Sequence, residues 1–571
     1  METEQIEMDL WNPTSPVEEG EDSDDEGSEL PPGWCWATIG DVVHVGTGAT
    51  PKRGNSRYWE KGTVPWVSSA VAGLDVVSEP SEYVTEDALR ETNLTLYPPG
   101  TLVVAMYGEG KTRGKCAELA IESTTNQALA ALNAAGTAVK IRRWLKAFLD
   151  YNYYETRRQA SGGVQPNLNL SIIREIRFPF APLLEQERIV EVIETEFTKL
   201  DAAIATLERT QRNLERYRAS VLKSAVEGRL VPTEAQLARE EGRDYEHAEV
   251  LLERILAERR RRWVEDYAEK YRAKDEAKAK EKGKPWTEED DLKSLEKHRK
   301  KGEVKYKDPE APDTAGLPEL PEGWVWVGPD QIASDEDYAL GIGPFGSNLK
   351  VSDYKTEGVP LIFVRNIRSG KFGGSEGKFV SEDKAETLRP HWVFPDDVLI
   401  TKMGDPPGDA CLYPQGRPYG VITADCIRLR VASVFQRPEY FTYAIRSHPV
   451  RSQILSITKG VAQPKVSLRR FKTLALPLPP PAEQERIVDE IDRLLSVAEE
   501  AQETVELNLR RSHRLRQSIL KWAFEGKLAD QNPSDEPAQK LLERIRAERE
   551  EMEAQAKPSR KKRRSSRRKK G

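Results

Sequence analysis

The residues from Thr101 to Thr112 read TLVVAMYGEGKT, an apolar run followed by a glycine, lysine and threonine turn. This order is typical of the strand and phosphate-binding loop of nucleotide hydrolases. The motif Gly-x-x-x-x-Gly-Lys-Thr must also begin with a glycine, because that glycine makes the turn in which backbone amides surround the phosphate. Ala105 occupies this position. The sequence therefore does not predict an ATP site here.

A second turn, Asp405-Pro406-Pro407-Gly408, is similar to the Asp-Pro-Pro-aromatic turn of adenine methyltransferases. Gly408 replaces the aromatic residue that would stack on a flipped base. The stretch PDDVLITK at 395–402 has an acidic residue and a lysine in the order of a nuclease metal site, but Ile400 stands where a second carboxylate is needed. The six histidines show no metal-binding spacing. No catalytic function is predicted.

Both motifs fall in a glycine loop that follows an apolar strand, once in each half of the chain. One loop carries Lys111, Arg113 and Lys115, and Lys402 opens the other. These cations suit contact with phosphates or bases. An ordinary tight turn with surface lysines would carry the same residues, and the sequence leaves both interpretations open.

The chain has 571 residues, which favours two to four domains. It has no apolar run of the roughly 20 residues needed to span a bilayer, and its acidic N-terminus does not fit a signal peptide. Its four cysteines form no CxxC pair, so neither a zinc ribbon nor a disulfide framework is indicated. We expect a cytoplasmic protein that does not associate with membranes.

The net charge of −7 is unevenly distributed along the chain. Residues 1–30 hold 12 acids and no bases, and residues 558–571 hold 9 bases and no acids. Both ends are predicted to be disordered tails. The basic tail suits contact with phosphates, or serves only as a flexible solubilising end.

The chain contains two copies of one plan, which is the strongest signal in the sequence. The segments between the first two repeated motifs differ in length by eight residues, whereas the helical modules have one constant length. This contrast indicates variable heads on invariant stalks. The repeated pairs are PPGWCW 31–36 and PEGWVW 321–326, Gln165-Pro166 and Gln463-Pro464, FPFAPLLEQERIV 178–190 and LPLPPPAEQERIV 476–488, AVEGRLVP 225–232 and AFEGKLAD 523–530, and LLERILAER 251–259 and LLERIRAER 541–549.

Each stalk begins after a proline-rich break and ends at a glycine, which are ordinary helix boundaries. Apolar residues repeat every 3.5 positions along it, and such a seam needs a partner helix. The simplest partner is the other stalk of the same chain. About 40 residues at 1.5 Å each give a rod of roughly 60 Å. The alternative is that each helix packs only on its own head.

The heads alternate short apolar strands with glycine, proline and serine turns, which predicts strand-rich α/β domains. Examples of these strands are TLVVAM, VPLIFV and DVLITKM. The predicted fold is therefore two strand-rich α/β heads joined by two long antiparallel coiled-coil helices, with a pseudo-two-fold internal repeat. The tryptophans of the repeated opening motif are expected in the core or against the stalk: Trp34, Trp36, Trp324 and Trp326.

This plan, with Pro-x-Pro before EQERIV at the start of each stalk and EGRL or EGKL at its end, resembles the specificity subunit of type I restriction–modification enzymes. The resemblance covers roughly residues 31–265 and 321–550. The acidic extension, a charged insert at 265–315 and the basic tail depart from the family pattern.

The resemblance implies a non-catalytic, DNA-binding subunit of a restriction system that defends against phage. Each head would be a target recognition domain that reads one half of an asymmetric bipartite target in double-stranded DNA. The paired helices would set the spacer and dock two adenine methyltransferase subunits, and motor and nuclease subunits would join the complex. DNA methylation with S-adenosylmethionine, and cleavage with ATP and Mg, would belong to those partners, so no cofactor is expected in this chain.

The resulting domain boundaries are as follows: acidic tail 1–30, target recognition domain 31–182, spacer helix 183–230, charged helical insert and linker 231–320, second target recognition domain 321–480, second spacer helix 481–528, C-terminal helical segment 529–557 and basic tail 558–571.

Candidate DNA contacts are the loops that mix basic, amide and aromatic groups, because arginine can bind guanine and asparagine can bind adenine. The loops around Gln165-Asn167 and Gln463-Lys465 recur in both heads, so they are assigned first to architecture. The candidates are Lys52, Arg53, Asn55, Arg57, Tyr58, Tyr107, Lys111, Arg113 and Lys115 in the first head, and Asn348, Lys350, Arg365, Asn366, Arg368 and Lys402 in the second.

Two functions of other classes compete with this hypothesis. One is a coiled-coil scaffold whose heads bind proteins, which would show no salt-sensitive DNA affinity. The other is an enzyme fusion that uses the glycine loop, which would lose nucleotide binding on Lys111→Ala.

Overall fold

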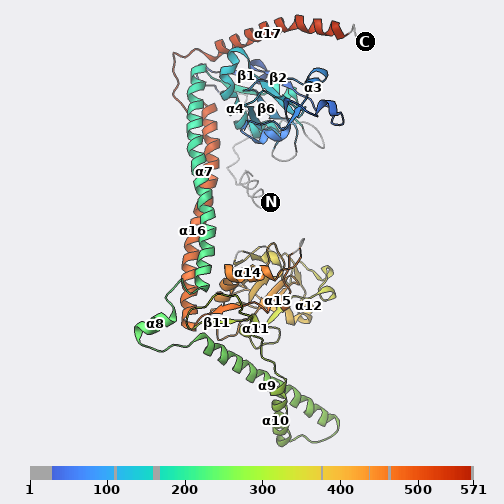
Figure 1. The fold of residues 1–571 in the computed structure, drawn as a ribbon, viewed down its shortest axis with the longest axis vertical. Coiled ribbons are helices and arrows are strands. Elements are labelled where there is room, and N and C mark those ends of the chain that lie inside the picture. Colours follow the sequence, from blue (N-terminus) through green and yellow to red (C-terminus); the bar gives the residue numbers. More distant parts are fainter. Residues whose placement is uncertain are drawn as a thin grey trace. The chain divides into compact units, whose positions relative to one another are not determined.

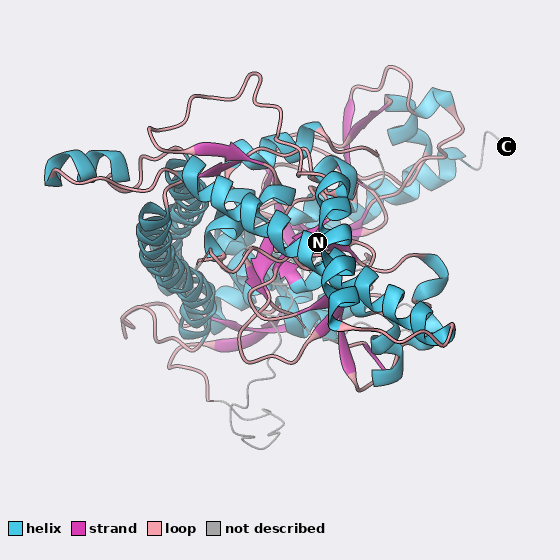
Figure 2. Ribbon diagram, turned by 90° about the horizontal axis from the view of Figure 1, so that it is seen from below, coloured by secondary structure: helices cyan, strands magenta, loops and turns pink. Residues whose placement is uncertain are grey.

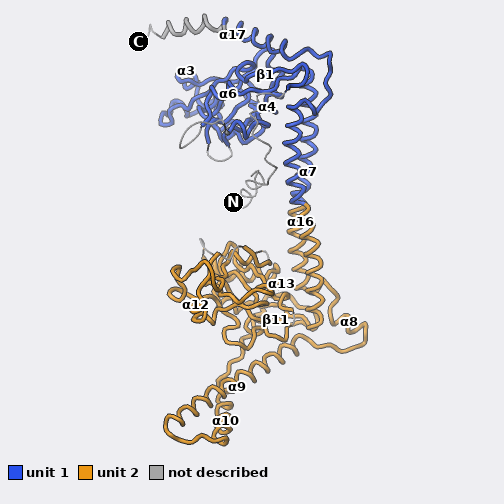
Figure 3. The backbone as a smooth tube through the Cα atoms, turned by 180° about the vertical axis from the view of Figure 1, so that it is seen from behind, with its two compact units in different colours: residues 1–209, 505–571 blue, residues 210–504 orange. Residues whose placement is uncertain are grey.

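The computed structural model describes residues 29–108, 112–158, 167–368, 370–374, 377–435, 437–460 and 464–567 (Figure 1). These residues belong to two compact units, one made of 1–209 with 505–571 and the other of 210–504 (Figure 3). Each unit thus combines a head from one repeat with helix ends from both. The strands of the protein are short and its principal helices are long (Figure 2).

The described residues of the first head form three sheets whose strands come from distant parts of the sequence. A mixed five-stranded sheet has the order β2-β9-β6-β7-β4, and a three-stranded sheet has the order β5-β3-β8. Strands β1 and β10 form an antiparallel pair that joins the start of the head to its end. The strand bounds are β1 Cys35–Thr38, β2 His44–Thr47, β3 Val64–Val67, β4 Val76–Val77, β5 Glu82–Val84, β6 Leu102–Ala105, β7 Cys116–Leu119, β8 Thr124–Thr125, β9 Leu129–Asn133 and β10 Arg177–Phe180.

Strand β6 is continuously apolar because the sheet is covered on both faces. Leu102 and Val104 point into one apolar core, and Val103 and Ala105 point into another. Side chains alternate across a strand, so a strand with two buried faces loses the polar alternation of a surface strand. The helices of this head are α2 Ile39–Val42, α3 Glu86–Glu91, α4 Arg142–Tyr151, α5 Tyr153–Arg158 and α6 Leu170–Glu175, with 3-10 turns η1 Ser56–Tyr58, η2 Ser69–Gly73 and η3 Gly136–Ile141.

The second head repeats this construction. Strand β18 lies inside a four-stranded sheet, β12-β21-β18-β19, and β11 pairs with β22 as β1 pairs with β10. A second sheet has the order β16-β13-β20-β17, and β14 pairs with β15. The strand bounds are β11 Val325–Val327, β12 Leu340–Ile342, β13 Val359–Ile362, β14 Ile367–Arg368, β15 Lys371–Phe372, β16 Phe379–Val380, β17 Trp392–Val393, β18 Val398–Thr401, β19 Ala410–Leu412, β20 Gly420–Ile422, β21 Cys426–Leu429 and β22 Leu476–Leu478.

The short helices of the second head surround these sheets. Their bounds are α11 Pro329–Ile332, α12 Glu382–Thr387, α13 Glu439–Arg446, α14 His448–Ser456 and α15 Leu468–Phe471, with 3-10 turns η4 Gly346–Asn348, η5 Val351–Asp353, η6 Val364–Asn366 and η7 Arg389–His391.

The two predicted stalks are the helices α7, Leu183–Val226, and α16, Pro481–Phe524, of 44 residues each. The repeated glutamine in their first turn fixes the entry of the chain. Gln186 donates to the Ala181 carbonyl at 2.7 Å, and Gln484 donates to the Pro479 carbonyl at 2.8 Å. Both helices are followed by a glycine with positive φ, which ends a helix without the steric cost that a Cβ would add.

Within each unit the two helices pack in antiparallel orientation along the predicted seam. In the first unit, Arg516 forms an ion pair with Asp201 at 2.6 Å and lies 4.3 Å from the Phe197 ring centroid. In the second unit, Arg218 donates to Gln502. These contacts join the two stalks, so the alternative of helices packed only on their own heads is wrong.

Each head is completed by helix ends from the other repeat. Phe524 of α16 and Leu541 of α17, Ala538–Arg567, lie in the core of the first head. Correspondingly, Val221 of α7 and Leu251 of α9, Ala248–Glu281, lie in the core of the second head. The repeated LLERI motif is therefore a packing segment for the head of the opposite repeat.

Between the two halves, α9 continues into a helical hairpin with α10, Glu288–Lys305, after the short helix α8, Glu234–Glu241. This hairpin is the predicted charged insert. An aromatic row stabilises it: Trp263, Tyr267, Tyr271 and His298 contact one another in sequence. Asp275 accepts from His298 at 2.8 Å across the hairpin.

Two other predictions can be compared with the described residues. Trp34 and Trp324 are buried and Trp326 is half-buried, whereas Trp36 is 41% exposed. Trp36 lies in β1 next to the buried Ala37, and adjacent residues of a strand point to opposite faces. Helix α17 continues as far as Arg567, into the segment predicted to be a disordered basic tail. The predicted acidic tail lies outside the described residues, except for its last two positions.

Candidate nucleic-acid interface

The glycine loops occupy equivalent places in the two heads, after β6 and after β18. The Leu168 amide donates to the Met106 carbonyl at 3.1 Å, and the Val466 amide donates to the Lys402 carbonyl at 2.9 Å. Ala105 lies within β6 and is fully buried. A strand residue cannot form the turn of a phosphate-binding loop, so the geometry agrees with the rejection of an ATP site. Lys111 lies outside the described residues.

The predicted contacts at 52–58 form a loop that is held by acidic side chains from the same head. Arg53 donates to both oxygens of Glu82, at 2.5 and 2.7 Å, and its guanidinium lies 3.9 Å from the Trp59 ring centroid. Because Arg53 donates to it, the pKa of the Glu82 carboxyl lies below its usual value. Lys52 is exposed beside this group.

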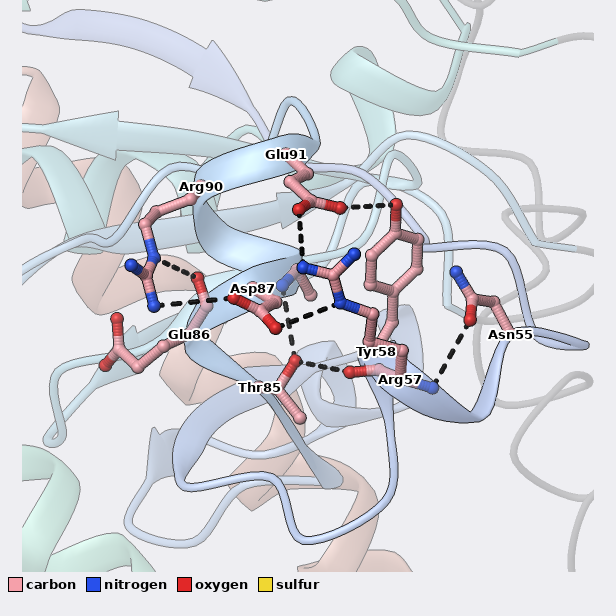
Figure 4. A network of polar contacts seen from close by, with 9 residues as sticks. Asn55, Arg57, Tyr58, Thr85, Glu86, Asp87, Arg90 and Glu91 are labelled. Carbon is pink, nitrogen blue, oxygen red and sulfur yellow. Dashed lines mark hydrogen bonds and ion pairs between the residues drawn. The ribbon is translucent and has the colours of Figure 1, made fainter.

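Figure 4 shows the remainder of this network, in which helix α3 supplies the acids. Arg57 donates to Asp87 at 3.0 Å and to Glu91 at 2.9 Å, and the Tyr58 hydroxyl donates to Glu91 at 3.2 Å. The Asn55 side chain accepts from the Arg57 amide and caps the η1 turn. The structure thus brings the predicted group together as a preformed, paired surface.

These pairs do not prevent contact with DNA. Exposed ion pairs contribute about 0–1 kcal/mol each because water screens them. A phosphate or a guanine edge can therefore replace a carboxylate at little cost. The acids of α3 also restrict the Arg57 side chain, which reduces the entropy lost on binding.

The remaining first-head candidates lie on the glycine loop. Tyr107 is 39% exposed. Arg113 and Lys115 are half-buried, and the Arg113 carbonyl accepts from Arg157 of α5 at 3.3 Å. The loop therefore rests against helix α5.

In the second head, four candidates lie at the surface. Asn348 ends the η4 turn, and the Lys350 amide donates to Asp353 at 2.8 Å and starts η5. Arg365 is exposed, with its guanidinium 4.3 Å from the Phe363 ring centroid. Arg368 is exposed at the end of β14.

Asn366 does not fit the role of a base reader. Its side chain is fully buried, accepts from the Phe363 amide at 2.9 Å and donates to the Gly373 carbonyl at 3.0 Å. The oxygen and the nitrogen of this side-chain amide therefore both hold the loop that carries Arg365 and Arg368. We remove Asn366 from the set of proposed contacts and retain it as a loop-forming residue.

Lys402 is more buried than a surface contact would be, with 9% of its area exposed. Its Nζ donates to the Ala424 carbonyl at 2.9 Å and lies 4.8 Å from the Phe345 ring centroid. Burial lowers the pKa of this lysine. It lines a pocket with three further cations, Lys459, Lys465 and Arg470.

Sequence reasoning missed those three cations because the Gln463-Pro464 motif between them was assigned to architecture. Their signal was the contrast with the first head, where Asn167 stands at the position of Lys465 and Ile172 at that of Arg470.

Among the described residues, no group of three or more His, Cys, Asp or Glu side chains is arranged to hold a metal ion. In the same part of the chain, no helix combines the length and apolarity needed to cross a membrane.

A family model described as the type I restriction modification DNA specificity domain matches residues 31–216 and 392–509. The type I restriction enzyme EcoBI specificity subunit of Escherichia coli is 25% identical over 469 residues, which cover 79% of this chain and 80% of that protein. The EcoR124I/EcoR124II specificity subunit of the same species is 24% identical over 195 residues, or 32% of this chain and 46% of that protein.

One solved structure, from work on complex assembly and conformational transition of the type I R-M system, aligns with 88% of this chain and 100% of its own. Its TM-score is 0.59 at 16% sequence identity, which shows a shared fold.

Proposed function

The chain belongs to the type I restriction modification DNA specificity family, and on this premise we propose that it is the sequence-reading subunit of a restriction–modification complex. The observation that carries the proposal is that two heads of equivalent construction present different surface residues on one pair of antiparallel helices. A protein that reads two unlike half-sites needs this combination.

Each head would read a few base pairs through donors and acceptors in a groove, and its other cations would contact phosphates. The first head offers Lys52, Arg53 and Arg57 on an acid-supported loop. The second offers Arg365 and Arg368, held by the buried Asn366. Because these surfaces differ in residue type and spacing, the two half-sites would differ as well, and the target would be asymmetric.

The helices α7 and α16 would set the number of base pairs between the half-sites. A helix of 44 residues is about 66 Å long at 1.5 Å per residue. The same helices would dock two adenine methyltransferase subunits, and motor and nuclease subunits would join through the complex. Methyl transfer with S-adenosylmethionine, and ATP- and Mg-dependent cleavage, would be carried out by those subunits.

An exchange of heads tests the proposal. Residues 31–182 are replaced by the first head of another specificity subunit, and the methylated sequence is mapped in cells that contain the methyltransferase subunits. We expect one half-site to change and the other to stay. The graft must retain apolar contacts with Phe524, Leu541 and Ile545, because these residues complete the core of the first head.

A change in both half-sites would contradict independent reading by each head. The absence of salt-sensitive DNA affinity in the assembled complex would favour a scaffold that binds proteins.

A further inference from the structure

The second head contains a pocket of about 370 Å³ whose lining is dominated by positive charge. Its lining residues are Lys402, Lys459, Lys465, Val466, Ser467 and Arg470. Four of these six side chains are cationic, and the only other polar side chain is a hydroxyl.

The backbone holds these cations in place. Lys402 follows the last residue of β18, and its carbonyl accepts from the Val466 amide at 2.9 Å. Lys459 and Lys465 lie directly opposite each other, joined by two backbone hydrogen bonds of 3.1 and 3.0 Å. Arg470 lies in α15 and donates to the Ile457 carbonyl at 3.2 Å.

The positive charge of the pocket is only partly offset by the head itself, through the Asp425 carboxylate, whose charge acts on Lys402. Within the described residues, no carboxylate lies within ion-pair distance of these four cations. Elsewhere in the same head, cations are paired, as Lys384 is with Asp353 at 3.3 Å and Arg430 with Asp397 at 2.8 Å. Like charges directly opposite each other on a strand pair destabilise it. An anion in the pocket would remove this repulsion.

In the described part of the first head, the residues equivalent to three of these cations are uncharged. Met106 takes the place of Lys402, since its carbonyl accepts from Leu168 as that of Lys402 accepts from Val466. Asn167 replaces Lys465, and Ile172 replaces Arg470. Among the described residues, the positive charge at positions 402, 465 and 470 is therefore not shared by the first head.

We propose that Lys402, Lys459, Lys465 and Arg470 form a binding site for one phosphodiester group of the DNA that the second head reads. This inference rests on the proposed function. The site offers donors from several directions to a single anionic centre, which suits the non-bridging oxygens of a phosphate. A guanine edge offers two acceptors but no net charge, so it would leave the positive charge of the pocket unneutralised.

The test replaces three pocket residues by those of the first head: Lys402→Met, Lys465→Asn and Arg470→Ile. The full chain, assembled with its methyltransferase subunits, is titrated against a duplex that contains the mapped target at several salt concentrations. Loss of one phosphate contact lowers the slope of log affinity against log salt by about 0.9. Across a fourfold range of salt this corresponds to a roughly 3.5-fold difference between parent and variant. The preferred bases should not change.

A matched control removes three exposed cations from the α9–α10 hairpin of the same unit: Lys278→Gln, Lys280→Gln and Lys284→Gln. This control lowers the net charge by as much as the pocket variant does, and we expect it to keep the salt slope of the parent. A second variant, Lys459→Gln with Lys465→Gln, changes only exposed side chains and tests the pocket without altering the buried lysine.

Each other result overturns the inference in a distinguishable way. If the parent complex shows salt-dependent binding and both pocket variants keep the salt slope of the parent, the pocket does not bind a phosphate of the DNA and the proposed function stands. An equal loss of slope in the control shows a general charge effect. If inorganic phosphate raises the melting temperature of the parent but not of the pocket variants, with unchanged DNA slopes, the site takes a free anion instead. If the parent complex does not bind DNA, both proposals fail.

Discussion

Phe524 provides the sharpest test of how the first head is completed. It is the last residue of α16 and is 6% exposed. Its ring centroid lies 4.6 Å from that of Trp144, 5.2 Å from that of Tyr151 and 5.5 Å from that of Phe148, all in α4. We predict that Phe524→Ala destabilises the first head although the residue belongs to the second repeat.

The magnitude follows from burial. Truncation of a buried phenylalanine to alanine costs about 3–5 kcal/mol, because apolar area is lost and a cavity remains. A domain has only about 5–15 kcal/mol of stability in total. Since each 1.4 kcal/mol is a factor of ten in an equilibrium constant, a loss of 3 kcal/mol makes opening of the head more than about 100-fold more frequent.

Amide hydrogen exchange followed by mass spectrometry measures this opening separately for each head. Peptides that contain β6 and β9 should exchange more than about 100-fold faster in the variant, while peptides from β18 and β21 should keep the parent rate. Faster exchange in the second head, or no change in the first, would refute the packing of α16 into the first core.

Two controls use the same construction. Trp522→Ala changes a larger side chain two residues earlier on α16, but it is 45% exposed, so its effect should stay within about 0.5 kcal/mol. Val226→Ala removes the counterpart of Phe524 in the second unit, where it is 3% exposed, and should accelerate exchange only in the second head.

Further predictions concern buried charge and helix length. Arg430→Gln leaves the Asp397 carboxylate, 2% exposed, without its charged partner and should cost about 3–5 kcal/mol of second-head stability, read by thermal unfolding. Burial raises the pKa of Glu483, so the contribution of this carboxyl to stability should fall as pH rises from about 4.5 through that raised pKa; the stability of the parent relative to Glu483→Gln should therefore fall over this interval in denaturant titrations at several pH values. One heptad inserted into α7 between 201 and 218, and another into α16 between 502 and 516, keeps the seam in register and adds about 10.5 Å, so methylation mapping should show a gap about three base pairs longer with unchanged half-sites.

The repeats and the heptads made most of the fold predictable. Strand β6 of the first head and its equivalent β18 of the second are each buried on both faces. The sequence shows this burial directly as a continuous apolar run. The stalk boundaries were predictable because proline, glutamine and glycine act locally. The head against which each LLERI segment packs was not predictable. A repeat shows that a segment recurs, but it does not show which of two similar heads the segment contacts.

The candidate interface was less predictable because its partners are distant in sequence. Arg53 and Glu82 are 29 residues apart, and Arg57 and Glu91 are 34 apart. In the sequence, a buried asparagine such as Asn366 cannot be distinguished from an exposed asparagine that contacts a base. The cations at 402 and 470 meet only because the Val466 amide bonds to the Lys402 carbonyl.

The crossed packing of the helix ends has a consequence for chain order. In the first unit the Ala538 amide donates to the Gly33 carbonyl at 2.8 Å, and in the second the Ala248 amide donates to the Gly323 carbonyl at the same distance. In the second case the α9–α10 hairpin already links the two partners covalently, whereas in the first they stand near opposite termini. A permuted polypeptide, joined from a shortened α17 to residue 31 and opened between 306 and 320, would therefore bury the same two cores: their integrity depends on adjacency in space and not on where translation starts.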